Sequence, residues 1–483
     1  MKITNVLLTL AGIGVTILLL LAACGDDPVS TGNDENGDEN GNGQIEGDVE
    51  VYLSMGNRLQ LDERQHPIPF SEESADITIE VDASEAFQSI TGFGAAMTGS
   101  SAYLIRQMDT DSREQLLTDL FDPEEGIGVS NIRLTIGSSD FSLSTYSYCD
   151  EPGLENFAIP DTDMRDLIPV MQQILKINPD IWIMASPWSA PAWMKDSNSM
   201  NGGSLKQEHF DDFAHYLKMF VQAYEEHGIP VHALTVQNEP LHETGGYPTM
   251  YMPWQDQNEF IRDHLGPLFE EEGLQTEIII WDHNWDNYNY PIQILDDPVT
   301  REYVVGSAFH GYAGDVGQMS NVHRTHPDKE LYFTEISGGG WATNFWSNIV
   351  WNYQHIFFGS LRQHSKNALL WNMALDENDG PKNGGCQNCR GVVTVTGQSS
   401  YQKNEEYYML AHIARDVRPG SKRISSSNPP VENLDYMAFE DPQEGLILVV
   451  INTSEHGRRL QVQSGKGSFI YSVPGNSLAT FVW

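Results

Sequence analysis

The sequence of 483 residues predicts a (β/α)₈ (TIM) barrel with a β-sandwich side domain that is built from both chain ends. In the middle of the chain, eight short apolar runs alternate with stretches of amphipathic helical spacing, as in parallel α/β folds. At both ends, short alternating segments recur at hairpin spacing. A doubly wound open sheet shares the alternation, but no Gly-rich phosphate turn follows the first run, so the barrel is favoured.

Residues 1–23 are predicted to be a secretory signal. Lys2 precedes an apolar run from Val6 to Ala23, and small residues lead up to Cys24. The sequence Leu21-Ala-Ala-Cys24 resembles a bacterial lipobox, which implies that Cys24 is lipidated and becomes the mature N-terminus. The alternative is an uncleaved transmembrane anchor, because the run is nearly long enough to span a bilayer. We therefore expect an exported lipoprotein anchored at the periplasmic or cell-surface face of a bacterial membrane.

Residues 24–50 are rich in Gly, Asn, Asp and Glu and offer almost nothing to bury, which predicts a disordered acidic linker. The β-sandwich is expected to combine residues 51–91 with residues 416–483. Alternation and hairpin spacing predict its strands at the following positions: Val49–Leu53, Asp76–Val81, Leu446–Ile451, Leu460–Val462, Phe469–Val473 and Leu478–Trp483.

Residues 92–415 are assigned to the catalytic barrel. Two intervening stretches, Asp163–Ile177 and Phe210–His227, have clear helical periodicity. The eight apolar runs that predict the barrel strands are Ile90–Met97, Asn131–Ile136, Ile181–Ala185, Val231–Val236, Glu277–Trp281, Val304–Phe309, Leu331–Thr334 and Ala368–Trp371.

The net charge of -41 limits the partners of the protein. Such a body repels nucleic acid and anionic lipid surfaces, so we expect no nucleic-acid partner and membrane contact only through the lipid anchor. A monomer is expected. Strong acidity also suggests adaptation to salt, which a stability series at increasing salt concentration would test.

The cysteines predict a disulfide that closes a short loop. Lipidation would use Cys24 and leave Cys149, Cys386 and Cys389, which cannot by themselves fill a four-thiolate zinc site. In an exported protein, Cys386 and Cys389 are expected to close a small disulfide loop, with a link to Cys149 as the competing possibility. No cluster of His, Asp and Glu has metal-ligand spacing, so we expect neither metal nor cofactor.

Two predicted barrel strands end in a glutamate. Glu239 follows the fourth strand and Glu335 ends the seventh, and barrel enzymes carry their reacting groups at these strand ends. Each glutamate could instead begin a helix, or pair with a lysine in the case of Glu335. The fourth and seventh strands lie nearly opposite each other, so both carboxylates can converge on one bond. Two facing carboxylates are what glycoside hydrolysis requires.

Other strand ends supply groups suited to a sugar site. Arg133 on the second strand could keep a nucleophilic carboxylate ionised, and Asn238 could hold a ring hydroxyl. Trp188 and Trp371 offer flat faces for a pyranose ring, while Asp140 and His310 could bond to hydroxyls. The alternatives are that the tryptophans belong to the core, that Arg133 forms a plain ion pair and that His310 is a satisfied polar group.

A series of motifs resembles glycoside hydrolase family 30, the family of lysosomal glucosylceramidase and of fungal and bacterial endo-β-1,6-glucanases. The likeness runs in order from about residue 90 to Arg415. Its motifs are Gly92-Phe-Gly-Ala-Ala, Asn131-Ile-Arg-Leu, Ser139-Asp-Phe-Ser142, Ser186-Pro-Trp-Ser-Ala-Pro-Ala-Trp193, Gln237-Asn-Glu-Pro240, Phe309-His-Gly-Tyr312, Thr334-Glu335, Trp371-Asn-Met-Ala-Leu375 and Gly380-Pro381.

The resemblance implies a retaining mechanism in which Glu239 is the acid/base and Glu335 the nucleophile. It also implies a substrate pocket made by the following residues: Asp140, Trp188, Asn238, Tyr247, His310, Tyr312 and Trp371. Two departures are visible. Gly311 stands where the glucosylceramidase type carries Trp, and the loop from Gly384 to Thr394 resembles the bacterial β-1,6-glucanase branch.

These features predict a lipid-anchored retaining endo-β-1,6-glucanase whose partner is β-glucan or another β-glucoside. A glucosylceramidase-like enzyme or another exo-β-glycosidase on the same scaffold is the alternative. A glycan-binding lipoprotein without activity is a further alternative, although a pure binder has no need of two facing acids.

Overall fold

The computed structural model describes residues 48–429 and 431–483, and in it the middle of the chain forms a closed parallel sheet of eight strands. The predicted signal, Cys24 and nearly all of the predicted linker lie outside the described residues. The order around the sheet is β10-β9-β8-β7-β6-β5-β4-β12. The ring closes between β10 and β12, where the Lys366 amide donates to the Leu331 carbonyl over 2.8 Å. The predicted barrel is thereby confirmed.

The eight barrel strands coincide with the eight predicted runs to within a few residues. The fourth is the shortest, with only three residues in the ladder. Their bounds are β4 (Gly92–Met97), β5 (Asn131–Ile136), β6 (Trp182–Pro187), β7 (Ala233–Thr235), β8 (Glu277–Asn284), β9 (Val304–His310), β10 (Glu330–Glu335) and β12 (Asn367–Leu370).

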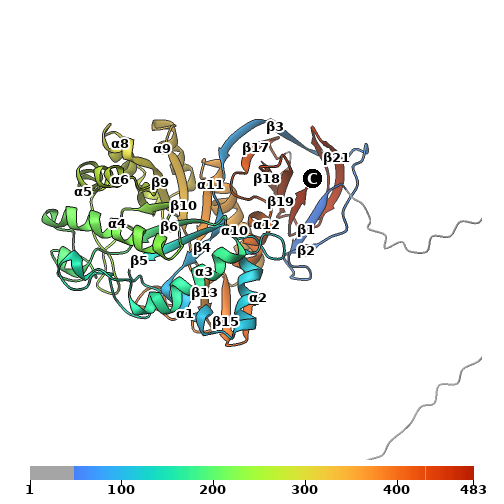
Figure 1. Ribbon diagram of the computed structural model, residues 1–483. Helices are drawn as coiled ribbons and strands as arrows, with labels where there is room; N and C mark the ends of the chain where they lie inside the picture. The colour runs from blue at the N-terminus through green and yellow to red at the C-terminus, as the bar shows by residue number, and fades with distance from the viewer. Residues whose placement is uncertain (1–47, 430) are drawn as a thin grey trace, which may run out of the picture. The chain divides into compact units, whose positions relative to one another are not determined.

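Helices surround this sheet (Figure 1). The helix α4 buries Phe213, Leu217 and Phe220, whose spacing of three to four residues puts them on one face. A π-helical turn, Asp163–Leu167, precedes α3, so together they span the helical stretch expected at 163–177. The helices are α1 (Gly99–Gln107), α2 (Thr110–Phe121), α3 (Ile168–Ile177), α4 (Phe210–Glu226), α5 (Trp254–Phe260), α6 (Gly266–Glu272), α7 (Asn289–Leu295), α8 (Thr300–Tyr303), α9 (Met319–Thr325), α10 (Phe345–Asn352), α11 (Phe358–Arg362) and α12 (Glu405–Ala414).

The β-sandwich contains strands from both chain ends, as expected. In Figure 1 the blue strands β1 and β3 lie among the red strands of the C-terminal segment. β22 pairs with β1 on one side and with β19 on the other. The strands are β1 (Glu50–Met55), β2 (Glu63–Arg64), β3 (Ile77–Ser89), β17 (Lys422–Ser426), β18 (Leu434–Glu440), β19 (Leu446–Asn452), β20 (Arg458–Ser464), β21 (Gly467–Val473) and β22 (Ser477–Val482).

The strand β3 is longer than the segment predicted at 76–81, because it serves two sheets. Its first residues pair in parallel with β20, and its later residues pair antiparallel with β17. Side chains from both layers, among them Val51, Leu448, Leu460 and Phe469, share one apolar core. That core needs residues from the beginning and the end of the described chain.

The sandwich is fastened to the last barrel helix, α12. His412 of this helix is fully buried and bonds through Nε2 to Ser54 Oγ at 2.8 Å and through Nδ1 to Thr480 Oγ1 at 3.0 Å. Burial lowers the pKa of His412 to about 4, so the ring is neutral near neutral pH. Arg415 and Asp62 add an ion pair beside it.

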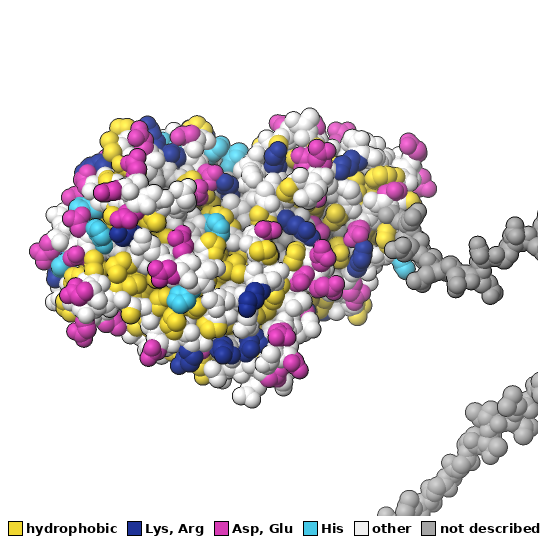
Figure 2. Space-filling model, in the orientation of Figure 1, with side chains coloured by type: hydrophobic (Ala, Val, Ile, Leu, Met, Phe, Trp, Pro, Cys, Tyr) yellow, Lys and Arg dark blue, Asp and Glu magenta, His cyan; other side chains and the backbone are white. Residues whose placement is uncertain are grey.

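Two small sheets lie on loops of the barrel. One pairs β11 (Gly338–Gly339) with β14 (Cys389–Arg390), and the other contains β13 (Ala374–Asp376), β15 (Val393–Gly397) and β16 (Ser400–Lys403). Within the described residues, every helix is too short or too polar to cross a bilayer. Acidic side chains are spread across the face shown in Figure 2, and basic side chains are fewer.

Candidate active site

Glu239 and Glu335 face each other at the carboxyl ends of the barrel strands. Glu239 follows β7, and Glu335 is the last residue of β10. One carboxylate oxygen of each, together with a ring nitrogen of His310, lies within 4.8 Å of the others. Glu335 is only 6% exposed, so its charge must be satisfied by the protein. The parallel strand ends thus bring together two acids that are 96 residues apart in the sequence.

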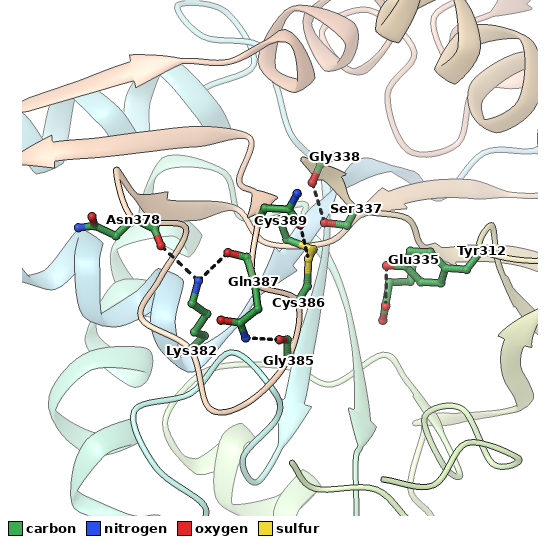
Figure 3. Close-up of a disulfide and its surroundings, with 11 residues drawn as sticks. Tyr312, Glu335, Ser337, Gly338, Asn378, Lys382, Gly385, Cys386, Gln387 and Cys389 are labelled. Atoms are coloured by element: carbon green, nitrogen blue, oxygen red, sulfur yellow. Dashed lines mark hydrogen bonds between the residues drawn. A yellow bond between two sulfur atoms is a disulfide. The ribbon is translucent and has the colours of Figure 1, made fainter. Parts of the chain in front are cut away.

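Two donors hold Glu335. Nη1 of Arg133, on β5, donates to Oε2. The Tyr312 hydroxyl donates to Oε1 over 3.0 Å, as Figure 3 shows. Arg133 is fully buried, and its guanidinium lies 4.8 Å from the centre of the Trp188 ring. Burial lowers the pKa of Arg133, but the anions Asp282 and Glu335 outweigh this effect and raise it. The result is a permanent positive charge against Glu335.

Glu239 has a different partner. His310, at the end of β9, places Nδ1 3.2 Å from Glu239 Oε1. Burial would raise the pKa of Glu239, but the hydrogen bond and charge of His310 lower it to about 2. For His310, burial would lower the pKa, but the anions Glu335, Asp282 and Glu239 raise it to about 9. Between these limits the pair Glu239–His310 holds one proton, which rests on the imidazole.

A fully buried carboxylate, Asp282, joins the two halves of the site. Its Oδ2 accepts from Arg133 Nη2 at 2.8 Å, and its Oδ1 lies 3.0 Å from His310 Nε2. Hydroxyl groups of three further strands also donate to it, each over 2.7 Å: Ser186, Thr235 and Thr334. Burial would raise the pKa of Asp282, but the Arg133 charge and these bonds hold it well below its usual range.

The apolar wall of the site is a stacked pair of tryptophans. The Trp188 and Trp371 rings lie 5.0 Å apart at 19°, and Phe141 meets Trp371 edge-on. Trp188 is 2% exposed and Trp371 is 4% exposed, so the two facing ring surfaces are covered by each other. Beside this wall, Asn238 accepts from Arg133 Nη2 at 2.7 Å through Oδ1, which fixes the orientation of its amide group.

Asp140 and Tyr247 complete the ring of expected residues. Burial and the charges of Glu335 and Glu239 raise the pKa of Asp140 well above its usual range. The Tyr247 hydroxyl lies 2.9 Å from His242 Nε2. Burial, then the charge of Asp140, raises the pKa of Tyr247, so its hydroxyl keeps a hydrogen that can be donated to a sugar oxygen near neutral pH.

Two protein-family models match the sequence. The model of the glycosyl hydrolase family 30 TIM-barrel domain matches residues 90–417, and the model of the glycosyl hydrolase family 30 beta sandwich domain matches residues 420–481. The chain belongs to glycosyl hydrolase family 30. It is therefore a glycosidase, and the resemblance found in its motifs is confirmed.

Relatives within family 30 carry different names. An endo-1,6-beta-D-glucanase of Trichoderma harzianum is 30% identical, over 82% of this chain and 84% of the relative. The lysosomal acid glucosylceramidase of Mus musculus is 29% identical, over 82% of this chain and 81% of the relative. Among solved structures, the endo-beta1,6-glucanase BT3312 is 35% identical, with a TM-score of 0.88 over 91% of this chain and 99% of that chain.

Two expectations about individual site residues change. His310 was expected to bond to sugar hydroxyls, but it is fully buried and both ring nitrogens face carboxylates, so it orients Glu239 instead. Trp188 and Trp371 were expected to offer flat faces, but they stack on each other. The contribution of Asp282 was missed: a polar strand end was visible there, but nothing in the sequence marked it as the common partner of Arg133 and His310.

The structure pairs Cys386 with Cys389 in a disulfide and leaves Cys149 buried as a free thiol. Glu239, His310 and Glu335 are the group of described residues whose atoms are close enough to hold a metal ion. The Arg133 guanidinium and the protonated His310 already supply positive charge there. The arrangement thus suits two carboxylates that act on a substrate better than it suits a cation.

Proposed function

We propose that this family 30 enzyme is a retaining endo-β-1,6-glucanase in which Glu335 is the nucleophile and Glu239 the acid/base. The observation that carries the proposal is the close approach of the two carboxylates, with oxygens within 4.8 Å, combined with their unlike partners. Retaining glycosidases hold their two carboxyl groups about 5–5.5 Å apart, whereas inverting enzymes need about 6.5–9.5 Å to admit water. The preference for β-1,6 linkages is supported by the names of the Trichoderma harzianum relative and of the solved structure of BT3312.

In the first step, Glu335 attacks the anomeric carbon of the sugar and forms a covalent ester, while the bond to the leaving oxygen breaks. Glu239 gives its proton to that oxygen, so that the leaving sugar departs as a neutral alcohol. Arg133 and Tyr312 aim the Glu335 carboxylate, and they restrict it to one orientation before the substrate arrives.

In the second step, Glu239 removes a proton from water, and the resulting nucleophile attacks the anomeric carbon. The ester bond breaks and Glu335 is released as a carboxylate, which restores the enzyme with retention of configuration. The positive charge of Arg133 stabilises the carboxylate that leaves. Asn238, held by Arg133, is placed beside Glu239 to bond to a ring hydroxyl.

The proton that Glu239 delivers is held by the pair Glu239–His310. In the free site it rests on His310, which lies between the anions Glu239 and Asp282. When the leaving oxygen of a substrate lies beside Glu239, the proton moves along the 3.2 Å contact from His310 Nδ1 to Glu239 Oε1. Glu239 is then protonated and can act as the acid. His310 thus acts through Glu239 rather than on the sugar.

The test compares the wild type with Glu335→Gln on pustulan, a β-1,6-glucan, on glucosylceramide and on an aryl β-glucoside. We expect gentio-oligosaccharides from pustulan, and a loss of kcat of about 10⁴-fold or more in the variant. Equal activity of wild type and variant would remove the nucleophile assignment. Cleavage of glucosylceramide alone would move the proposal to the glucosylceramidase-like alternative, and no cleavage by either protein would favour a glycan-binding lipoprotein.

We further infer, from the sequence of the N-terminal segment, that the enzyme is exported and that Cys24 carries a lipid anchor. We also propose that the folded body acts as a monomer. Labelling of cells with a fatty-acid analogue should mark the wild type and not Cys24→Ser, and light scattering of the body without residues 1–47 should give the mass of one chain. A label that persists in Cys24→Ser would contradict the anchor.

A further inference from the structure

The loop that contains the disulfide forms part of the wall of the active site. Cys389 belongs to the same apolar cluster as Trp188 and Trp371, and both Cys386 and Tyr247 pack against this cluster. Cys389 is buried at 4% exposure. The disulfide thus lies against the aromatic rings of the site. A disulfide that only closed a distant surface loop would not contact these rings.

Two glycines let this loop approach other site residues closely. A Cβ atom on Gly385 would lie 2.2 Å from Asp140 Oδ2, and one on Gly384 would lie 2.1 Å from the Gly246 carbonyl, next to Tyr247. The amide of Asn383 also donates to the Asp140 carbonyl over 2.7 Å. The loop therefore touches the segments that carry Asp140 and Tyr247, which follow two different barrel strands.

The same loop is joined to the strand that ends in Glu335. β14, which begins at Cys389, pairs with β11, whose first residue is three positions after Glu335. The amide of Gly340 donates to the Asn388 carbonyl over 2.8 Å and continues this contact. A movement of the disulfide would thus displace the segment that directly follows Glu335.

Internal bonds brace the loop between these contacts (Figure 3). Lys382 Nζ donates to the carbonyls of Gln387 at 2.8 Å and of Asn378 at 3.3 Å. Gln387 Nε2 donates to the Gly385 carbonyl at 2.7 Å. Gln387 itself is exposed and Cys386 is half-buried, so a small reductant in solution can reach the disulfide.

We propose that the disulfide Cys386–Cys389 is a positioning element of the catalytic site, which holds Asp140, Tyr247 and the Glu335 strand in the arrangement that binds the sugar ring. The proposal rests on the proposed function, since it assigns these contacts to sugar binding. Opening the disulfide loosens this wall while the barrel and the sandwich stay folded. Misplacement of substrate-positioning groups by about 1 Å lowers a rate by up to about 10²-fold.

The test measures kcat and KM on an aryl β-glucoside, which needs only the sugar pocket, before and after treatment with dithiothreitol. Dithiothreitol gives two electrons and two protons to the disulfide, which becomes two thiols, and is itself oxidised to its cyclic disulfide. We expect kcat/KM to fall by about 10-fold or more, with a rise in KM. It should recover after dithiothreitol is removed and oxidised glutathione is added, which takes up the two electrons and two protons of the thiols and becomes two molecules of reduced glutathione. The melting temperature and the circular dichroism spectrum should indicate a folded protein throughout.

Three variants make the result specific. Cys386→Ser/Cys389→Ser should show the low activity without reductant and no further response to it, whereas Cys149→Ser should respond like the wild type. Gly385→Ala, whose added methyl group meets Asp140, should raise KM with the disulfide intact. Full activity of the reduced wild type and of the double serine variant would overturn the proposal. Glu335→Gln tests the proposed function separately, because its outcome does not depend on the disulfide.

Discussion

At the scale of single residues, Asp282 is the group on which the geometry of the site depends. It is fully buried and accepts hydrogen bonds from Arg133, from His310 and from hydroxyls of three other strands. Arg133 holds Glu335 and His310 holds Glu239, so the Asp282 carboxylate aligns both acids through these two side chains. The Asp282 carbonyl also accepts from the Glu239 amide at 3.0 Å. Asp282 is therefore a positioning residue, and its removal should disturb the two acids together.

We expect Asp282→Asn to lose about 3–5 kcal/mol of unfolding free energy, because it leaves the Arg133 guanidinium with one buried anion fewer. The same change removes a charge that raises the pKa of His310, so the alkaline limb of the pH profile should move to lower pH. Denaturant unfolding and kcat/KM against pH measure the two effects. The control is Asp435→Asn, at the ion pair with Arg362, which should leave the profile in place. An unchanged profile in Asp282→Asn would contradict the assignment.

The pH dependence of the wild type follows from the shared proton. The pKa of His310 is raised to about 9, so the pair Glu239–His310 keeps its proton below that pH and loses it above. We expect kcat/KM on an aryl β-glucoside to fall tenfold per pH unit above about pH 9, because the free enzyme then lacks the proton that the acid delivers. In His310→Gln this limb should shift or disappear. A limb that stays in place would show that another group controls it.

The sequence predicts Glu239 and Glu335 because each ends a short apolar run, and parallel runs end at one face of a barrel. It places Asp282 at the end of the fifth strand but does not predict that this side chain binds both Arg133 and His310. Trp281 and Asp282 have positive φ angles of 72° and 61°, and the pairing of β8 with β9 shifts its register between Trp281 and His283. Simple alternation along the strand therefore fails there, and the direction of the Asp282 side chain depends on a local irregularity that no periodicity reveals.

At the scale of elements, Lys195 ties two active-site loops together. Its Nζ donates to Ser189 Oγ at 2.8 Å and to the carbonyls of Met200 at 2.9 Å and Thr249 at 2.7 Å. Ser189 follows Trp188 in the loop after β6, and Thr249 follows Tyr247 in the loop after β7. Burial lowers the pKa of Lys195 to about 7, yet three acceptors match the three hydrogens of an ammonium group.

We expect Lys195→Met to destabilise the protein by about 2–4 kcal/mol, because it leaves buried acceptors without a donor. Both loops should also loosen, which would raise KM for an aryl β-glucoside. Amide hydrogen exchange over residues 196–206 and 244–251 measures this directly. The matched control is Lys218→Met, which removes only a pair with Glu272 at the surface and should leave the exchange unchanged. Equal exchange in both variants would show that Lys195 does not hold the loops.

The sequence predicts the elements better than their ends. All eight barrel strands lie where the apolar runs predict them, since burial on both faces makes each run continuous. The ladder of β7 stops at Thr235, although its predicted run continues to Val236. β17 and β18 were not predicted as separate strands. β17 contains Lys422, Arg423, one isoleucine and two serines, a composition without the alternation that marks a strand.

At the scale of the whole molecule, the acidic charge should make stability depend on salt. The chain has 68 acidic and 27 basic side chains, and like charges repel one another across the folded surface. Added salt shortens the range of this repulsion, from about 30 Å at 0.01 M to about 8 Å at 0.15 M. We expect the melting temperature to rise by a few degrees between these concentrations and to level off above them, as scanning calorimetry would measure. A constant or falling melting temperature would contradict this expectation.

The pairing of β22 with both β1 and β19 also determines when the protein can fold during its synthesis. Residues 50–55 leave the ribosome early, yet their partner at 477–482 is made only after the entire barrel. Until then β1 has an open edge, of the kind that pairs with other chains. A chain that ends between the barrel and residue 477 would therefore leave β1 and β19 without their shared partner, with strand edges that are open to other chains.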